Sequence, residues 1–430
     1  QAVVDHDRKI METRFVARPG PAARFGPTTL AGDSGVADGL ILGRIPWREG
    51  DRYRPDLLDK ARKDVAALGA FDGVAAIPDL TQGAAGVVPV TVRAEPRLRR
   101  FIGASALYSS DEGFGVRAWW GHRNLFGGAE RLRVDFATAR LGTSTVKAGG
   151  LDKTDFQLGA LLEVPDFLVR GQNLHLYFRA VSENPAAYAR RGEVGGVGLE
   201  RRFSDRLTGK LAVEQDASHV ETNSGDYRVA LVGVTGAAAW DSSDNPLDPT
   251  RGYRLTAELG AWTPFAGAGA KAFGLASVEG RAYHDLFGDG DAVLAGRLGL
   301  ASLTAQKRSD VPPHRRLYAG GGASVRGYAA QMAGPRDSLG DPTGGLSRID
   351  AGAEVRVKVA ESIGVTPFID AAMVGDSALG GFNDGVRAGA GLGVRYYTDF
   401  GPLRADLAFP FGRESNDSLL QLYISFGQAF

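Results

Sequence analysis

The chain has 430 residues, 60 of them glycine, and its 50 lysines and arginines balance 50 aspartates and glutamates. This balance gives no net charge to draw the chain to nucleic acid, and the lack of cysteine excludes a disulfide framework, a thiolate metal site and a cysteine nucleophile. No run of about 18 apolar residues is present, so no transmembrane helix is expected. A barrel strand turns only every second residue to lipid, so the modest hydropathy remains compatible with a membrane β-barrel.

Residues 1–21 carry a single strand-like run, Lys9–Ala17, which Arg18-Pro-Gly-Pro21 ends. One strand does not fold alone, so we expect this segment to be the remainder of an upstream domain. The chain opens with Gln1-Ala-Val-Val-Asp5, which has neither the basic region nor the apolar region of a signal peptide. We therefore expect no signal peptide in the sequence.

Residues 22–97 predict a small α/β module. Its second helix is the clearest element, because Pro55 suits the first turn, Gly69 suits the C-terminus, and an apolar stripe runs between them at helical spacing. The predicted elements in chain order are a strand at Phe25–Gly32, helices at Val36–Ile45 and Pro55–Gly69, and strands at Phe71–Ile77 and Val87–Ala94.

From residue 98 onward the sequence alternates apolar and polar residues, which is the period of a β-strand. Leu346–Val359 is the clearest case, because Arg348, Asp350 and Glu354 share one face while apolar residues fill the other. A lipid-facing arginine or lysine at the bilayer midplane costs roughly 2–4 kcal/mol, so the charged face is predicted to point into a polar lumen.

The alternating segments predict an all-β membrane protein, in which residues 98–430 form a sixteen-stranded antiparallel transmembrane barrel. An even number of strands is typical of a single-chain bacterial barrel. The eleventh to sixteenth strands are expected at Asp291–Thr304, Leu346–Val359, Ile363–Met373, Val386–Tyr397, Pro402–Phe411 and Leu419–Gly427.

Residues 306–345 form a long connection without a strand pattern, and connections of this length in a compact fold usually have a function. They contain the quartet Val325-Arg326-Gly327-Tyr328. The quartet resembles the hallmark of the outer-membrane assembly-factor superfamily, which includes BamA and the two-partner secretion transporters. The neighbouring Gly334-Pro-Arg-Asp337 and Asp341-Pro-Thr-Gly-Gly345 resemble the TamA branch most closely.

Two further stretches carry the resemblance. Trp240–Tyr253 is similar to the superfamily's turn between the eighth and ninth strands. Leu422–Phe430 is similar to its outer-membrane insertion signal, an amphipathic last strand followed by Gly427 and the terminal aromatic Phe430. The resemblance implies a periplasmic POTRA domain at 22–97, a remnant of another at 1–21, and a barrel at 98–430 whose long loop folds into the lumen.

The resemblance also implies a function in the outer membrane of a Gram-negative bacterium. A TamA-like protein would insert or secrete autotransporter-type clients through a passive lateral gate. Its implied partners are a TamB-like protein anchored in the inner membrane, unfolded outer-membrane clients and outer-membrane lipids, with no nucleic acid. The alternatives are a BamA-type general insertase, a two-partner secretion transporter, and a porin-like channel.

A lumenal Arg326 needs a carboxylate partner, because a desolvated guanidinium is costly when unpaired. Asp370 is the first candidate, since it shares the lumenal face with Phe368 and resembles the family's Phe-x-Asp motif on the thirteenth strand. Glu354 on the twelfth strand is the second.

The first and last strands, near Arg99–Tyr108 and Leu419–Gly427, are expected to form a weakly paired seam. The first strand contains Gly103-Ala-Ser-Ala106, whose small side chains offer little cross-strand packing. Gly427 at the end of the last strand adds no side chain to pack.

Catalysis is not expected, and no catalytic residue, metal site or cofactor is predicted. Gly32-Asp-Ser-Gly35 matches the serine-protease nucleophile motif but lies at a strand-to-helix turn, where these residue types serve as caps. Gly322–Gly327, which contains Ser324, is not a Gly-x-Ser-x-Gly nucleophile elbow. The six histidines show no metal-ligand spacing.

Overall fold

The computed structural model describes residues 2–5, 10–13, 22–81, 86–110, 112–141, 154–415 and 417–430. The chain divides into two compact units, Gln1–Arg99 with Arg123–Ala129 and Arg100–His122 with Glu130–Phe430. None of the helices among these described residues is long and apolar enough to cross a membrane.

The first unit begins with a hairpin of β1 (Ala2–Asp5) and β2 (Ile10–Thr13). Ala2 lies opposite Thr13 and Asp5 opposite Ile10. The expectation of a single strand in this segment was therefore wrong, because β1 is too short to show a periodic pattern. Residues 14–17 of the strand expected there lie outside the described residues.

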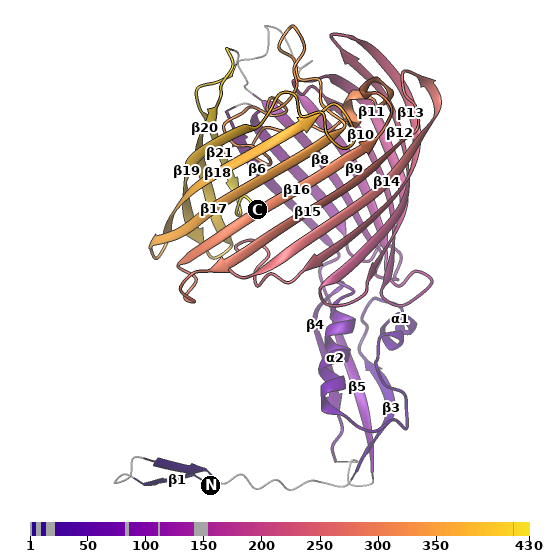
Figure 1. The fold of residues 1–430 in the computed structure, drawn as a ribbon. Coiled ribbons are helices and arrows are strands. Elements are labelled where there is room, and N and C mark those ends of the chain that lie inside the picture. The colour runs from indigo at the N-terminus through magenta and orange to yellow at the C-terminus, as the bar shows by residue number, and fades with distance from the viewer. Residues whose placement is uncertain are drawn as a thin grey trace. The chain divides into compact units, whose positions relative to one another are not determined.

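The α/β module has the predicted element order. It consists of β3 (Arg24–Ala31), α1 (Asp38–Gly43), α2 (Pro55–Ala66), β4 (Phe71–Pro78) and β5 (Val87–Pro96), and the sheet order is β3-β5-β4 (Figure 1). Strand β3 runs parallel to β5, and β4 runs antiparallel to it. Phe25 stacks on Trp47 at 4.5 Å between ring centroids, and Ile41 and Val65 are fully buried with them. Helix α1 is shorter than predicted, whereas α2 begins at Pro55 as expected.

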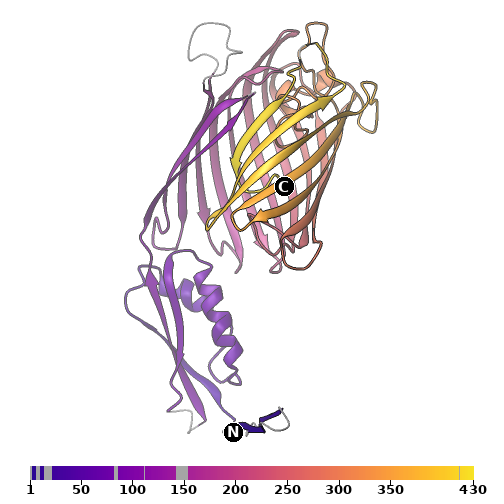
Figure 2. The same ribbon diagram turned by 90° about the vertical axis from the view of Figure 1, so that its left-hand side faces the viewer.

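The second unit is a closed barrel of sixteen antiparallel strands in the described part of the chain, which confirms the predicted fold (Figures 1 and 2). The strands are β6 (Arg100–Ser109), β7 (Gly113–His122), β8 (Arg131–Leu141), β9 (Asp155–Val164), β10 (Gln172–Glu183), β11 (Ala189–Arg202), β12 (Leu207–Thr222), β13 (Gly225–Asp241), β14 (Gly252–Ala268), β15 (Phe273–Asp285), β16 (Ala292–Thr304), β17 (Ser347–Ala360), β18 (Ile363–Gly375), β19 (Arg387–Thr398), β20 (Gly401–Phe411) and β21 (Gln421–Phe426).

The six strands bounded from the sequence correspond to β16 through β21. The last differs most, because β21 begins at Gln421 and ends at Phe426 rather than spanning Leu419–Gly427. Gly427 has a φ of 85°, a left-handed conformation in which the chain leaves the strand.

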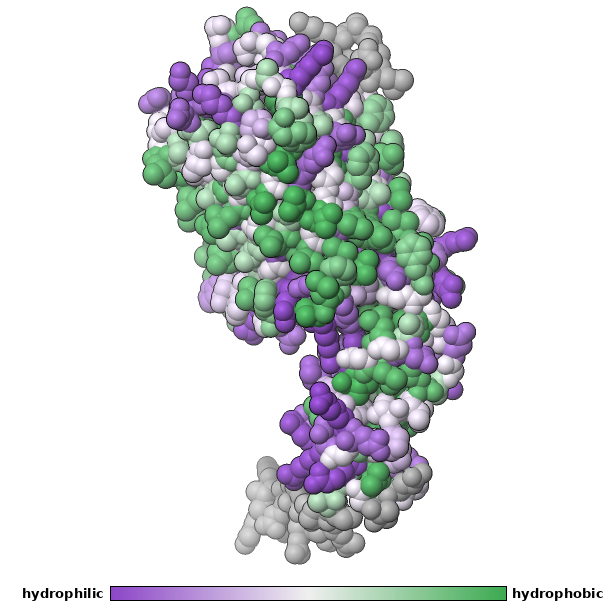
Figure 3. Space-filling model, turned by 90° about the vertical axis from the view of Figure 1, so that its right-hand side faces the viewer, coloured by the Kyte–Doolittle hydropathy of each residue, from purple (hydrophilic) through white to green (hydrophobic). Residues whose placement is uncertain are grey.

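The barrel strands alternate between an apolar exterior and a polar interior. On β18 the side chain of Ile369 is 51% exposed, whereas its neighbours Phe368 and Asp370 are buried in the lumen. Figure 3 shows one face of the molecule, on which apolar side chains form a broad band over the barrel wall between more polar ends. This pattern is the one expected of strands that face lipid on one side only.

The connection between β16 and β17, residues 306–345, folds into the barrel, and we call it the lumenal loop. It contains two short 3-10 turns, Arg308–Asp310 and Pro313–Arg315. Val325, Arg326 and Tyr328 at its tip are almost completely buried. The loop therefore fills part of the lumen with its own packed side chains.

Candidate functional site: the lumenal loop and the strand seam

The tip of the lumenal loop approaches the barrel wall as closely as a glycine allows. Gly327 has a φ of 104°, and a Cβ there would lie 2.8 Å from the main-chain carbon of Phe409 on β20. A larger residue would need both a strained backbone and a displaced strand. Glycine after Arg326 thus lets the loop press its arginine against the wall.

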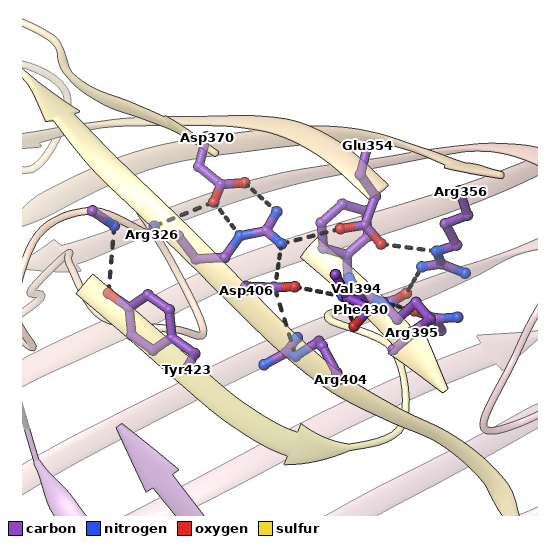
Figure 4. A network of polar contacts seen from close by, with 12 residues as sticks. Arg326, Glu354, Arg356, Asp370, Val394, Arg395, Arg404, Asp406, Tyr423 and Phe430 are labelled. Carbon is purple, nitrogen blue, oxygen red and sulfur yellow. Dashed lines mark hydrogen bonds and ion pairs between the residues drawn. The ribbon is translucent and has the colours of Figure 1, made fainter. Parts of the chain in front are cut away.

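Arg326 meets both of the carboxylates expected from the sequence (Figure 4). Its Nε and Nη2 donate to Asp370 at 2.6 and 3.1 Å, and its backbone N–H donates to the same carboxylate at 3.2 Å. Its Nη1 donates to Glu354 at 3.2 Å. The guanidinium also lies 3.5 Å from the ring centroid of Phe368, a cation–π contact. The loop arginine is therefore held by β17 and β18 together.

A third carboxylate, Asp406 on β20, also accepts a hydrogen bond from Arg326 Nη1, at 3.0 Å. Sequence reasoning did not name it. The alternation of β20 was the available signal, because Arg404 and Asp406 fall on the lumenal face. Asp406 is shared with Arg395 of β19, which donates to its other oxygen, and Arg404 lies within ion-pair distance at 3.6 Å.

The charges of the network nearly balance, and its side chains are buried from solvent. Its side chains are at most 9% exposed, and they comprise four arginines and three carboxylates: Arg326, Arg356, Arg395, Arg404, Glu354, Asp370 and Asp406. Arg356 Nε donates to Glu354 at 2.8 Å. Charges buried in this way are tolerated only when each is paired, so loss of one member strands the others.

A second anchor holds the upstream half of the lumenal loop, and sequence reasoning missed it. Asp216 on β12, which is fully buried, accepts hydrogen bonds from Arg315 Nε at 2.9 Å and from Arg190 Nη2 of β11 at 3.0 Å. His314 Nε2 lies 3.1 Å from the same carboxylate, and Arg315 also reaches Glu214 at 2.8 Å. The signal was the lumenal alternation of Glu214 and Asp216 on β12.

The segment after β21 turns into the lumen instead of extending the wall. Both Gly427 and Phe430, the expected insertion-signal residues, lie in this inward tail, and Figures 1 and 2 place the C-terminal end within the barrel outline. The Phe430 ring is buried beside Tyr283 and Val293. Arg356 Nη2 donates to the main-chain oxygen of Phe430 at 2.6 Å, which joins the tail to the Arg326 network.

The turn between β13 and β14, within the Trp240–Tyr253 stretch, also binds this tail. Gln428 Nε2 donates to Asp248 at 2.8 Å, and the Gln428 N–H donates to the Leu247 carbonyl at 3.3 Å. Arg356 Nη1 donates to the Pro249 carbonyl at 3.1 Å. The turn and the tail therefore share one cation from β17.

Strands β6 and β21 close the barrel through a short seam. They pair at only two positions, Tyr423 with Ser109 and Ile424 with Tyr108, whereas β20 and β21 pair at six. One further main-chain bond runs from Ser110 N–H to Leu422 O at 2.9 Å. Residues 102 to 107 of β6 have no register partner on β21, in agreement with the weak seam expected from the small side chains there.

The two serines of the candidate nucleophile motifs serve the local backbone. Ser34 Oγ donates to the Val36 carbonyl at 2.9 Å, and Ser324 Oγ accepts from the Gly320 N–H at 3.2 Å. Among the described residues, no three histidine, aspartate or glutamate side chains are grouped to hold a metal ion.

Comparison with known proteins identifies the family. The model of the Omp85 superfamily domain matches residues 124–430. The chain belongs to the Omp85 superfamily.

Two curated relatives are the outer membrane protein assembly factors BamA of Neisseria meningitidis serogroup B and of Neorickettsia risticii. The first is 22% identical over 493 residues, covering 100% of this chain and 59% of the relative. The second is 24% identical over 408 residues, covering 90% of this chain and 52% of the relative. This chain thus spans little more than half the length of these relatives.

Two solved structures share the fold. BamA from Haemophilus ducreyi lacking POTRA domains 1-3 matches with a TM-score of 0.77 and 16% identity, over 99% of this chain and 88% of that one. CdiB from Acinetobacter baumannii matches with a TM-score of 0.62 and 14% identity, over 95% and 74% respectively. The barrel fold and the BamA relatives together indicate an outer-membrane protein of a Gram-negative bacterium.

Proposed function

We propose that this protein inserts or secretes other proteins at the outer membrane by admitting a client strand at the seam between β6 and β21. The seam is the observation that carries the proposal, because it pairs at only two positions. Residues 102 to 107 of β6 have no register partner on β21, and a strand edge of this kind templates the addition of another strand. Six residues of edge correspond to about 20 Å of strand.

The process proposed here is passive. Each client residue that pairs with β6 satisfies main-chain N–H and C=O groups that a bilayer leaves unsatisfied, so strand addition itself supplies the driving force. The lumenal loop and its Arg326 network brace the wall formed by β17, β18 and β20 while the seam admits a strand. No nucleophile or cofactor is needed, and we propose that the chain is not an enzyme.

Within the superfamily we place the chain in the TamA branch. The support is the pair of loop motifs at Gly334–Asp337 and Asp341–Gly345, which are tied together by the Asp337 N–H bond to the Asp341 carbonyl at 2.9 Å. On this proposal residues 22–97 are a periplasmic POTRA domain, the partner is a TamB-like protein anchored in the inner membrane, and the clients are autotransporter-type proteins together with outer-membrane lipid.

The BamA and CdiB relatives support two other members of the same class, a general insertase and a two-partner secretion transporter. The client that crosslinks to β6 in cells distinguishes them. An autotransporter barrel favours the TamA branch, many unrelated barrels favour a BamA-type role, and one dedicated secreted protein favours a two-partner transporter.

A disulfide lock tests the seam. Tyr108 and Ile424 are register partners, and directly paired antiparallel residues have Cα atoms about 4.5–5.5 Å apart, within the range a disulfide bridges. The oxidised Tyr108→Cys/Ile424→Cys variant should lose client assembly and regain it on reduction. The native chain has no cysteine, so any disulfide that forms in the variant joins the two introduced cysteines.

The matched control joins two strands away from the seam, Val357→Cys on β17 and Val365→Cys on β18, which are also register partners. This variant should remain active when oxidised. Full client assembly with a verified seam disulfide would contradict the proposal and favour passage through the lumen.

A further inference from the structure

We propose that the Tyr423 hydroxyl is the positioning group through which the lumenal loop sets the pairing of the seam. This inference rests on the proposed function, since the seam matters only if clients enter there. Tyr423 is the residue at which the loop tip and the seam meet, and its side chain is 3% exposed.

On the loop side, the Tyr423 hydroxyl engages two consecutive residues of the conspicuous quartet. It donates to the Tyr328 carbonyl at 3.1 Å and accepts from the Gly327 N–H at 3.4 Å. Figure 4 shows Tyr423 beside Arg326 at the end of the ion-pair network. The ring of Tyr423 also packs closely on Gly322, where a Cβ would lie 3.0 Å from its Cδ1.

On the strand side, Tyr423 is one of the two β21 residues that pair with β6, opposite Ser109. Its ring packs with Phe368 of β18 and Ala408 of β20 in a buried cluster. A tyrosine ring is rigid, so a displacement of the hydroxyl is passed to the main chain of β21 at the point where the seam is closed.

The arrangement makes the loop tip and the seam interdependent. Arg326 fixes the loop tip to β17, β18 and β20 through its carboxylates. Gly327 and Tyr328 follow it directly in the chain, so their main-chain groups are held in place for the Tyr423 hydroxyl. Withdrawal of the loop tip removes the two hydrogen bonds between that hydroxyl and the loop, which favours movement of β21.

Tyr318 of the same loop provides a matched control, because its hydroxyl donates to the Pro313 carbonyl at 2.9 Å rather than to the last strand. Both Tyr423→Phe and Tyr318→Phe remove one hydroxyl and keep the ring. They differ in whether the lost bond touches the seam.

The test is hydrogen–deuterium exchange of the full chain in lipid nanodiscs, with no client present. Tyr423→Phe should speed exchange of the peptides that contain Tyr108, Ser109, Tyr423 and Ile424 about three- to tenfold, the effect of losing the 3.1 Å hydrogen bond to Tyr328, to which loss of the longer 3.4 Å bond from Gly327 adds little. Tyr318→Phe should leave these peptides as in the wild type. The Ser110 bonds to β21 remain in both variants, so the seam should stay closed on average.

A double variant separates coupling from simple local damage. Arg326→Lys should also speed exchange at the seam, and adding Tyr423→Phe to it should speed exchange little further, because both changes break the same connection. Additive effects would show two independent losses and would overturn the inference. Wild-type exchange at the seam in Tyr423→Phe would overturn it as well.

The exchange experiment tests the coupling and the disulfide lock tests the proposed function, so either proposal can be wrong without the other. If the lock leaves client assembly intact while Tyr423→Phe still speeds seam exchange, the proposed function fails and the coupling stands. If exchange is unchanged while the lock blocks assembly, the coupling fails and the proposed function stands.

Discussion

At the scale of single residues, Arg326 is a buried charge held from several sides. Its guanidinium contacts Asp370, Glu354 and Asp406 on three strands and lies against the Phe368 ring. Planar, forked donors suit several carboxylates at once, which lysine cannot reproduce with a single ammonium group. The residue thus joins the loop to the wall through geometry as well as through charge.

We expect Arg326→Ala to impair client assembly more than barrel insertion. Removing one partner of a buried ion pair costs about 3–5 kcal/mol, because the remaining carboxylates are left unpaired. Gel mobility before and after heating measures barrel folding, and surface display of a client measures assembly. Arg202→Ala is the control, since both Arg202 and its partner Asp205 are exposed and their ion pair contributes little. Wild-type client assembly by Arg326→Ala would contradict this account.

Asp370 and Glu354 were predictable, because the family resemblance implied a lumenal arginine and a Phe-x-Asp motif, alternation put both acids on the lumenal face, and a buried arginine requires an acid. Asp406 and Asp216 lie on lumenal faces by the same alternation, but no sequence pattern gave their depth in the barrel. The level at which residues of different strands meet depends on strand tilt and stagger, which the sequence of one strand does not contain.

At the scale of elements, the lumenal loop is held at two places on different parts of the wall. Arg315 and His314 bind Asp216 on β12, and Arg326 binds strands β17, β18 and β20. Two anchors on separate strands fix the direction of the loop as well as the position of its tip.

Asp216→Asn should loosen the upstream half of the loop while leaving the barrel folded. The variant loses the negative charge shared by Arg315 and Arg190, so each of these cations keeps only one carboxylate partner, Glu214 or Glu183. Limited trypsin cleavage after Arg315 or Arg316 in the folded protein should become faster. The control is Glu221→Gln, which changes an exposed residue near the end of the same strand. Trypsin should cleave this variant at the wild-type rate. Equal cleavage rates in Asp216→Asn and the wild type would show that the second anchor is dispensable.

The strand positions were predictable where alternation was long, as for β16 to β20. The last strand was predicted but its bounds were less accurate, because its end depends on a backbone angle at Gly427 and on lumenal partners of Gln428 and Phe430 that lie on other strands. The seam was predictable as a weakly paired pair of strands, whereas its two-residue register was not, since register depends on neighbours around the whole barrel.

At the scale of the whole molecule, packed protein occupies part of the lumen. The described interior contains the lumenal loop, the inward tail and the ion-pair network between them. A porin-like channel, by contrast, requires a continuous aqueous path.

The wild-type protein in planar bilayers should therefore give small, irregular current steps. Replacing residues 312–342 with a short Gly/Ser linker removes both loop anchors and should give larger, steadier openings. Large steady openings already present in the wild type would contradict a plugged lumen and would favour the porin-like alternative.

The lengths of the strands have a consequence for the surrounding bilayer. Strands β12 to β14 have 16 or 17 residues, whereas β6 has 10 and β21 has 6. At the ~45° tilt typical of such barrels, six residues rise only about 14 Å, against a hydrocarbon core of about 30 Å. The wall beside the seam is too short for an undisturbed bilayer, so lipids there must thin or tilt. A thinned bilayer shortens the apolar distance that the polar groups of an entering polypeptide have to cross.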